Sequence, residues 1–396
     1  MRLAVLVLLP ALLIAGCLDG SESLPAGGES QGVPGVEAPQ DSQTPVVQPS
    51  AEAPFRSKFY ISAVRDMLVF NGKLYFIGST RKEAATVYEY VDEKTPPKRV
   101  LRLGWGSEND FDSSSGDPRL KGKGMELNSL VEYGGVLYAA GETGLFKMKQ
   151  DGSWEMLDTL VPPGARKEDG ISIVRMKKFS GGVYAAATYG KDGSGPSGRT
   201  TFGLLKFTGD GWHEVYDTLS TGQDLAEYAG EVYLTGDGTL EKLVFEDGKA
   251  AVKSETATAP ESLDVYFGIG RFGRVGSDGN AVYVCGDGKK VFRYAGGWTL
   301  AGQVGDSCEF FDKAGNTLYF GVQHGKYEKV PQSEVGLFKI EGGGIKQVAS
   351  GEFVSPSAII EYNGELIVGG HENYEGTGGI YKITGGKLQK IEYYEG

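Results

Sequence analysis

Two of the three histidines in the chain occur in the same short pattern, His-x-x-Tyr-Glu. The copies begin at His324 and His371 and end at Glu328 and Glu375. Imidazole and carboxylate together are ligands for a divalent transition metal, and Tyr with Glu suits a sugar-like ligand through stacking and hydrogen bonding. These four residues are therefore the candidate metal or acid–base site. The alternative is that the two loops share an ancestor and are both solvated, because a sequence does not show whether they converge.

Residues 107–117 form a second group of oxygen-bearing side chains, in which Ser, Asp, Glu and Asn follow one another closely. Ca²⁺ prefers such ligands, but the segment lacks the alternating acidic spacing of an EF-hand loop, so we interpret it as a solvated acidic loop. The sequence has no Gly-x-Ser-x-Gly elbow, phosphate-binding Gly-rich loop or His-Glu-x-x-His motif. We therefore predict no catalytic residue and no cofactor beyond the divalent metal that the His and Glu residues could bind.

The first 17 residues have the composition of a secretory signal. An apolar run from Leu3 to Ile14 follows one Arg, and it is too short to span a bilayer as a permanent helix. The next residues, Ala15-Gly16-Cys17, complete a segment that resembles the lipobox of prokaryotic lipoproteins. This resemblance implies that Cys17 is lipidated, that the lipid anchors the chain to the membrane, and that the protein is extracytoplasmic. An ordinary signal peptide or an uncleaved anchor implies the same location.

Residues 18–54 contain six Pro, six carboxylates, and no Lys, Arg or aromatic residue. Such a segment cannot bury enough apolar surface to offset its ordering entropy, so we expect a disordered tether. Beyond Cys17 the chain has two further cysteines, Cys285 and Cys308. An oxidising compartment allows them to pair, and the alternatives are a disulfide between neighbouring repeats or two buried thiols that pack as small apolar residues.

The elements that must position these residues are repeated short strands in residues 55–396. Each repeat has an apolar strand, a turn rich in Gly or Asn, a strand with a Tyr-like position, and two further strands. The Tyr-like position occurs seven times, at Tyr75, Tyr138, Tyr184, Tyr233, Tyr283, Tyr319 and Ile367. Four antiparallel strands in roughly 49 residues, repeated in this way, predict an all-β, seven-bladed β-propeller of four-stranded antiparallel blades.

The repeat resembles that of the kelch-type propellers. The likeness lies in second strands that end in Gly, as at Gly369-Gly370, and in an aromatic residue on the third strand followed by Trp on the fourth, as in Phe146 and Trp154. The resemblance implies the fold. Kelch-like propellers serve mainly as interaction platforms and in a minority of cases as enzymes, and the fold does not decide between these roles.

The first strands of propeller blades line a central channel. Four polar residues lie near the starts of these strands and are candidates for a ligand site on the axis: Asn128, Asp224, Arg271 and Asp306. The alternative is a water-filled channel. The turns between first and second strands are short, whereas the longest segments, such as 104–126 and 188–201, fall on the opposite rim. Because long loops in compact domains are usually functional, we expect a ligand on that long-loop face.

A net charge of −12 and a pI near 5.0 argue against nucleic acid as a partner. We interpret the chain as a lipid-anchored extracytoplasmic β-propeller that binds a protein, peptide or glycan on its long-loop face, without catalysis of its own. The alternative is a surface hydrolase or lyase that acts on carbohydrate through the His and Glu site. Complete first and last blades also predict that the ring closes by packing rather than by strand exchange.

Overall fold

The computed structural model divides into two units, Met1–Pro54 and Phe55–Gly396. It describes residues 58–80, 83–101, 127–141, 144–157, 171–190, 200–208, 212–218, 224–235, 239–243, 255–258, 272–286, 289–323, 330–351, 354–372 and 378–394. The predicted signal peptide, Cys17 and the predicted tether lie outside these ranges. Among the described residues, no helix is both long enough and apolar enough to cross a membrane.

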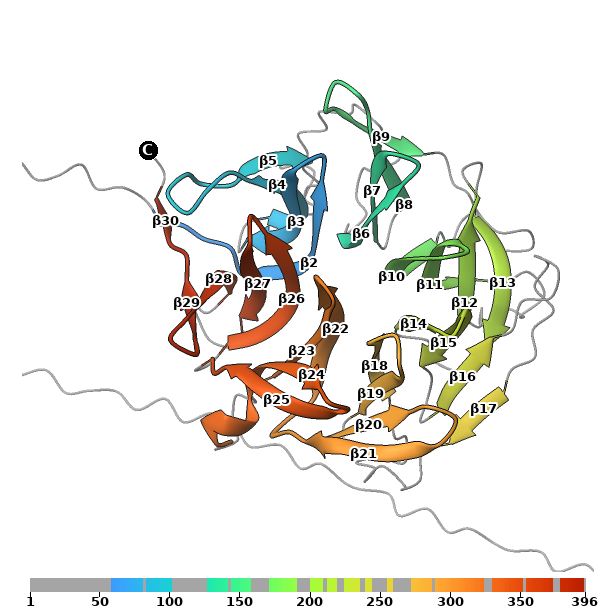
Figure 1. The fold of residues 1–396 in the computed structure, drawn as a ribbon. Coiled ribbons are helices and arrows are strands. Elements are labelled where there is room, and N and C mark those ends of the chain that lie inside the picture. Colours follow the sequence, from blue (N-terminus) through green and yellow to red (C-terminus); the bar gives the residue numbers. More distant parts are fainter. Residues whose placement is uncertain are drawn as a thin grey trace, which may run out of the picture. The chain divides into compact units, whose positions relative to one another are not determined.

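The second unit is an all-β, seven-bladed propeller, as the repeat predicts (Figure 1). Each blade is one four-stranded antiparallel sheet whose strands follow chain order outward from the centre. Blade 1 consists of β2 (Ala63–Phe70), β3 (Lys73–Thr80), β4 (Glu83–Tyr90) and β5 (Lys98–Leu101). Blade 2 consists of β6 (Leu127–Tyr133), β7 (Val136–Gly141), β8 (Gly144–Met148) and β9 (Trp154–Leu157). Blade 3 consists of β10 (Ile171–Phe179), β11 (Gly182–Gly190), β12 (Thr200–Phe207) and β13 (Trp212–Thr218). Blade 4 consists of β14 (Leu225–Tyr228), β15 (Glu231–Thr235), β16 (Thr239–Leu243) and β17 (Glu255–Thr258).

Blades 5 to 7 follow the same plan. Blade 5 consists of β18 (Phe272–Ser277), β19 (Val282–Gly286), β20 (Lys290–Tyr294) and β21 (Trp298–Gln303). Blade 6 consists of β22 (Cys308–Ala314), β23 (Thr317–Val322), β24 (Gly336–Glu341) and β25 (Gly344–Ala349). Blade 7 is β26 (Val354–Tyr362), β27 (Glu365–Glu372), β28 (Gly379–Thr384) and β29 (Lys387–Lys390). A single 3₁₀ turn, η2 (Gln332–Glu334), precedes β24 within the described part of the chain.

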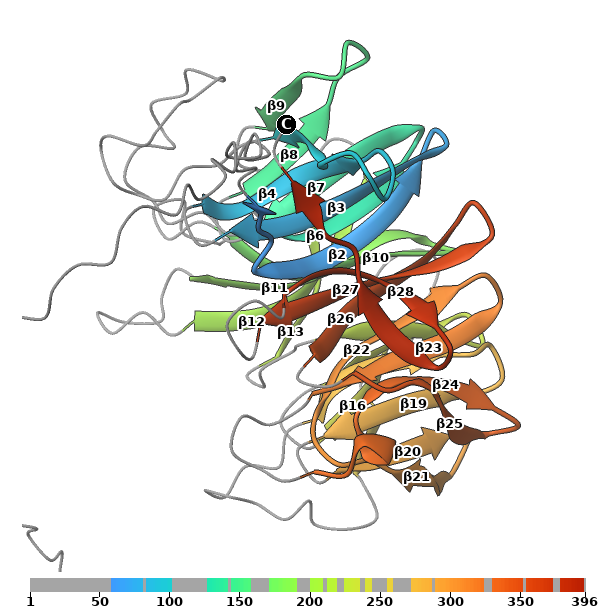
Figure 2. The same ribbon diagram turned by 90° about the vertical axis from the view of Figure 1, so that its left-hand side faces the viewer.

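Short turns join the first strand of each blade to the second, and they lie on one side of the ring, at the right in Figure 2. Two of them use Asn followed by Gly: φ is 50° at Asn71 and 73° at Gly72, and 53° at Asn363 and 80° at Gly364. Asn and Gly tolerate this left-handed conformation, which a tight hairpin between right-twisted strands requires. We call this side of the ring the turn side.

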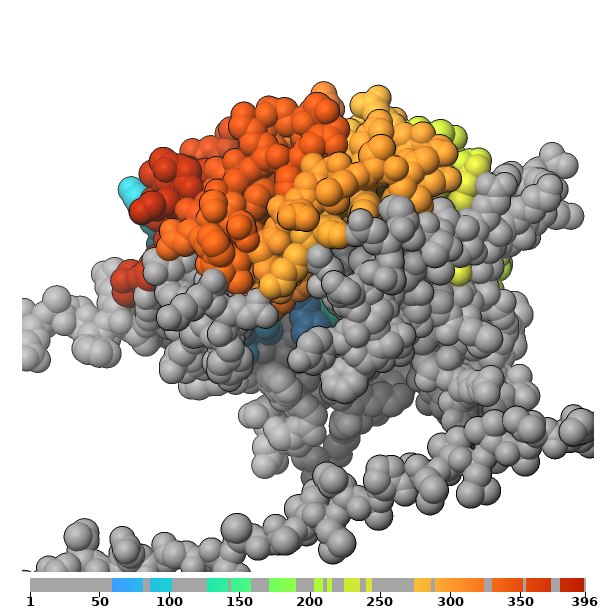
Figure 3. Space-filling model, turned by 90° about the horizontal axis from the view of Figure 1, so that it is seen from below, coloured from blue at the N-terminus to red at the C-terminus, as the bar shows by residue number. Residues whose placement is uncertain are grey.

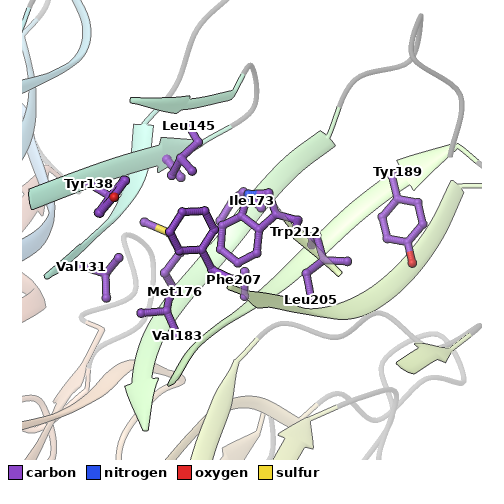
Figure 4. Packing of buried hydrophobic residues seen from close by; sticks show 13 residues of the cluster. Val131, Tyr138, Leu145, Ile173, Met176, Val183, Tyr189, Leu205, Phe207 and Trp212 are labelled. Atoms are coloured by element: carbon purple, nitrogen blue, oxygen red, sulfur yellow. The ribbon is translucent and has the colours of Figure 1, made fainter. Parts of the chain in front are cut away.

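Apolar side chains fill the spaces between blades. One cluster joins blades 2 and 3: Tyr138 and Leu145 of blade 2 pack with Met176, Phe207 and Trp212 of blade 3 (Figure 4). The Phe207 ring lies 5.3 Å from that of Tyr138 and 5.2 Å from that of Trp212, between centroids. The Tyr-like position and the Trp of the fourth strand therefore belong to the inter-blade core.

Blades 5 and 6 are joined near the centre of the ring, from the second strand of blade 5 to the inner strand of blade 6, and also near the outer edge. Cys285, at the end of β19, and Cys308, at the start of β22, form a disulfide with Cα atoms 5.9 Å apart. On the outermost strands, a Cβ atom at Gly302 would lie 2.5 Å from the side chain of Ile345, so glycine is required for this close approach. In Figure 3 the residues of blades 5 to 7, coloured orange to red, form a continuous face.

The ring closes through a pair of short strands as well as by packing. β1 (Lys58–Phe59) pairs with β30 (Tyr393–Tyr394), and this two-stranded sheet joins the segment before blade 1 to the segment after blade 7. The Ser62 N–H donates to Ser79 O in blade 1, and the Ile391 N–H donates to Ile380 O in blade 7, each at 2.8 Å. As predicted, no blade exchanges a strand with another, but packing is not the whole of the closure, because β1 and β30 also pair by backbone hydrogen bonds.

Candidate functional site

The inner strand of every blade has one edge without a neighbouring strand, and this edge faces the channel. One residue of each inner strand directs its N–H and C=O there, at the same register against the second strand. We call these the edge residues: Met67, Leu130, Met176, Leu225, Val275, Phe311 and Ile359, paired with Phe76, Ala139, Ala185, Leu234, Val284, Phe320 and Val368. Their polar groups need partners, because an unpaired buried N–H or C=O is costly.

A β-bulge precedes the edge residue in six of the seven inner strands that the structure describes. The register shifts between Val64 and Asp66, Leu127 and Ser129, Ile173 and Arg175, Phe272 and Arg274, Cys308 and Phe310, and Pro356 and Ala358. A bulge changes the direction in which nearby side chains point. The residue after the bulge, just before the edge residue, is therefore placed to interact with the channel edge of the next blade.

Two aspartates at this position bridge neighbouring blades. Asp66 accepts hydrogen bonds from the Met67 N–H at 2.9 Å and, in blade 2, from the Leu130 N–H at 2.8 Å. Asp224 repeats the arrangement between blades 4 and 5, where it accepts from the Leu225 N–H at 2.9 Å and the Val275 N–H at 3.3 Å. Each carboxylate thus accepts hydrogen bonds from the edge-residue N–H groups of two successive blades.

Ser129 makes the equivalent contact between blades 2 and 3. Its hydroxyl oxygen accepts a hydrogen bond from the Met176 N–H at 3.0 Å, and the hydroxyl donates to the Asp66 carboxylate at 2.9 Å. Asp66, which is 7% exposed, therefore belongs to a hydrogen-bonded network that joins blades 1, 2 and 3.

Two cationic side chains of β10 cross the channel. Arg175 donates from Nη2 to Asp312 in blade 6 at 2.6 Å, and this nitrogen lies 3.8 Å from Asp66 in blade 1. The Lys177 ammonium lies 3.0 Å from Asp224 in blade 4 and donates to the carbonyl oxygens of Val275 at 3.2 Å and Phe311 at 3.4 Å. Blade 3 is thereby tied to blades 1, 4, 5 and 6.

Burial sets the electrostatics of this network. Burial raises the pKa of Asp66, and the like charge of Asp312 adds to the effect, whereas Arg175 opposes it. Burial alone would lower the pKa of Arg175, but the carboxylates of Asp312, Asp66 and Asp224 outweigh it and raise that pKa. Arg175 therefore carries a permanent positive charge at the centre of the ring.

A cavity of about 410 Å³ lies in the channel on the turn side of this network. Arg175 and Asp312 lie at its inner end, and its wall includes Leu68 and Ile360 from blades 1 and 7 and Lys313 from blade 6. The lining extends along the inner strands toward the short turns, as far as residues such as Phe179 and Lys313. We call this space the turn-side cavity. It is large enough for a small organic group or the end of a chain.

Three of the four predicted channel residues lie in the described part of the chain, and each of them takes part in hydrogen bonds within the protein. Asn128 accepts from Arg65 Nη1 at 2.6 Å and donates to Ile173 O at 3.0 Å, so it joins three blades. Asp224 holds blades 3, 4 and 5 together as described. Asp306 accepts from the Ser307 N–H at 2.7 Å, and Arg271 lies outside the described residues.

Asp66, Arg175, Lys177 and Asp312 are not among the site residues predicted from the sequence. A sequence signal marks two of them: Lys177 and Asp312 stand at an inner-strand position that holds a small or apolar residue in the other five blades. The position of Asp66 and Arg175 is charged in four of the seven blades, so the charge there does not single them out. Their spacing from the Tyr-like position is the same as that of uncharged residues in other blades. Which blades their side chains reach, however, depends on the closed ring.

The predicted His and Glu site lies largely outside the described residues, because His324, Glu328 and Glu375 do. His371 is half-buried at the end of β27, where its Cα pairs with that of Ser355. Across the described ranges, no group of three or more His, Cys, Asp or Glu residues could hold a metal ion. The acidic loop at 107–117 also lies outside them.

Neither a protein-family model nor a curated protein sequence matches the chain. Several solved structures of low sequence identity are similar to the chain. YCF48 bound to D1 peptide is 13% identical, with a TM-score of 0.49 over 82% of this chain and 96% of that chain. The WD40 β-propeller domain of Doa1 is 12% identical, with a TM-score of 0.44 over 81% and 95%. Sqt1 of Saccharomyces cerevisiae is 12% identical, with a TM-score of 0.49 over 83% and 99%. At this identity the likeness concerns the fold, and the kelch resemblance stays a prediction.

Proposed function

We propose that the protein is a lipid-anchored, extracytoplasmic binding propeller that recognises a protein, peptide or glycan and catalyses no reaction of its own. The observation that most supports this function is that the charged side chains in the channel bond to groups of other blades. Asp66, Asp224, Arg175 and Lys177 are each engaged by groups of other blades at hydrogen-bonding distance. A catalytic acid or base must offer a proton or a lone pair to the substrate, whereas the polar atoms of these groups are engaged by other groups of the fold.

The proposed site is the turn-side cavity, which combines apolar side chains with a few polar groups as binding pockets usually do. Leu68 and Ile360 supply the apolar side, and Lys313 and Glu227 supply charges near the turns. The long-loop face stays a second, predicted location, since its loops lie outside the described residues. The predicted anchor at Cys17 gives the proposed location at the membrane.

The test is capture of partners by the full chain in detergent micelles, from extracts of surface proteins and on glycan arrays. Lys313→Glu reverses a charge at the cavity, and Lys387→Glu makes the same change on the outermost strand of blade 7. We expect Lys313→Glu to weaken capture by about tenfold or more and Lys387→Glu to leave it unchanged. Carbohydrate turnover that disappears in His371→Ala would instead support the hydrolase or lyase alternative.

A further inference from the structure

The edge residues of blades 6 and 7 lack the partner that the other blades have. Phe311 and Ile359 pair with Phe320 and Val368 at the same register as the other edge residues. The Phe311 C=O points into the channel, since it accepts a hydrogen bond from Lys177, and its N–H lies on the same edge. Within the described part of the chain, neither the Phe311 N–H nor the Ile359 N–H has a hydrogen-bond acceptor.

The other five edge N–H groups show what acceptor fits this position. A carboxylate bridges the pair in blades 1 and 2 at 2.9 and 2.8 Å, and another bridges the pair in blades 4 and 5 at 2.9 and 3.3 Å. The hydroxyl of Ser129 accepts from the remaining edge N–H group, that of Met176. In blade 6, Phe310 occupies the place of Asp66 and Asp224, and its ring packs toward Gly321 and the backbone of Pro356. Phe310 therefore supplies no acceptor to this pair.

The unpaired N–H groups belong to residues that line the turn-side cavity, as do Asp312 and Lys313 of the same strand. Asp312 would repel an anion, but its charge is paired with Arg175 at 2.6 Å. Lys313 is exposed and has no charged partner among the described residues. Two N–H donors and a lysine without a charged partner therefore line the turn-side cavity at blades 6 and 7, where no carboxylate among the described residues accepts from the edge N–H groups.

We propose that the turn-side cavity binds a carboxylate, which bridges the N–H groups of Phe311 and Ile359 as Asp66 and Asp224 bridge theirs, with Lys313 as counter-charge. The ligand is either the C-terminal carboxylate of a peptide or a small carboxylic acid. This inference rests on the proposed binding function and gives it a ligand class. Charge-assisted hydrogen bonds of this kind are stronger than neutral ones.

The test is NMR titration of the ¹⁵N-labelled full chain in detergent micelles at neutral pH and constant ionic strength. The probes are the peptide N-acetyl-Ala-Ala-Ala as the free acid, the same peptide as its C-terminal amide, and sodium acetate. We expect the free acid to shift the Phe311 and Ile359 amide signals saturably, and the amide to bind at least about tenfold more weakly, because it offers no anionic oxygen.

Lys313→Gln should weaken binding of the free acid by about five- to tenfold, and Lys387→Gln, which removes an exposed lysine from β29, should not change it. Acetate that binds as tightly as the peptide acid identifies a small carboxylic acid as the ligand, and tighter binding of the peptide identifies a chain terminus. Equal binding of acid and amide, or no shift at Phe311 and Ile359, overturns the proposal. Partner capture that persists in that case leaves the proposed function standing.

Discussion

At the residue scale, Asp66 shows how a charged residue in a propeller channel can be part of the fold. Its carboxylate accepts hydrogen bonds from the Met67 N–H, the Leu130 N–H and the Ser129 hydroxyl, so both oxygens have partners. Asp224 was predicted as a channel residue because it lies near the start of an inner strand. Asp66 was not, because in the sequence it lies within an apolar strand pattern, and its partners are 63 and 64 residues away.

Asp66→Asn should lower the free energy of unfolding by about 1–3 kcal/mol, because an amide cannot accept all three hydrogen bonds. Burial raises the pKa of Asp66 in the folded protein, so the folded state holds this proton more tightly than the unfolded state. The stabilisation from that proton is complete below the unfolded pKa and is lost as the pH rises through the folded pKa.

The difference in unfolding free energy between wild type and Asp66→Asn should therefore be larger near pH 4 than at pH 7. Urea unfolding at both pH values measures it. A difference that grows with pH would mean that the hydrogen bonds and Arg175 outweigh burial and that the pKa of Asp66 is lowered.

At the element scale, the strands and short turns follow directly from the sequence. Asn71-Gly72 and Asn363-Gly364 predict turns that the structure places at residues with positive φ. The pairing of β1 with β30 could not be predicted, since two-residue strands have no periodic pattern and their partners lie at opposite ends of the propeller unit. The inner-strand bulges also have no signal in a single repeat, and they become visible only as a shift in register.

The pairing of β1 and β30 should contribute to stability mainly through Tyr393, which is 2% exposed. We expect Tyr393→Ala to lower the unfolding free energy by about 3–5 kcal/mol, because it removes a buried aromatic ring at the junction of blades 1 and 7. Tyr394→Ala is the matched control, since its neighbouring side chain is 47% exposed, and it should change stability by less than about 0.5 kcal/mol. Similar effects of the two substitutions would exclude a role for Tyr393 in closing the ring.

The disulfide between Cys285 and Cys308 closes a segment with a sequence separation of 23. A loop of this length should stabilise the folded chain by about 3 kcal/mol, chiefly by restricting the unfolded state. Thermal unfolding with and without dithiothreitol should show a lower transition for the reduced wild type and no effect on Cys285→Ser/Cys308→Ser. Two titratable thiols in the unreduced wild type would contradict the pairing.

At the scale of the whole molecule, the repeat predicts the propeller, but the candidate site depends on the closed ring. Arg175 and Asp312 are 137 residues apart, and Lys177 reaches carbonyl groups 98 and 134 residues away. Such contacts follow from the number and register of the blades together, which no single repeat contains. The His pattern was visible in the sequence because it is local, yet most of it lies outside the described residues.

The central claim is that the charges in the channel hold the blades together, and unfolding of Lys177 variants in urea tests it most directly. Lys177→Met leaves Asp224, 2% exposed, without its cation, so we expect a loss of about 3 kcal/mol. Lys177→Met/Asp224→Ser should recover at least about 1 kcal/mol of this, because a hydroxyl serves the equivalent position at Ser129. Lys178→Met, whose side chain is 53% exposed, is the control and should cost less than about 1 kcal/mol. A Lys177→Met variant as stable as Lys178→Met would contradict the claim.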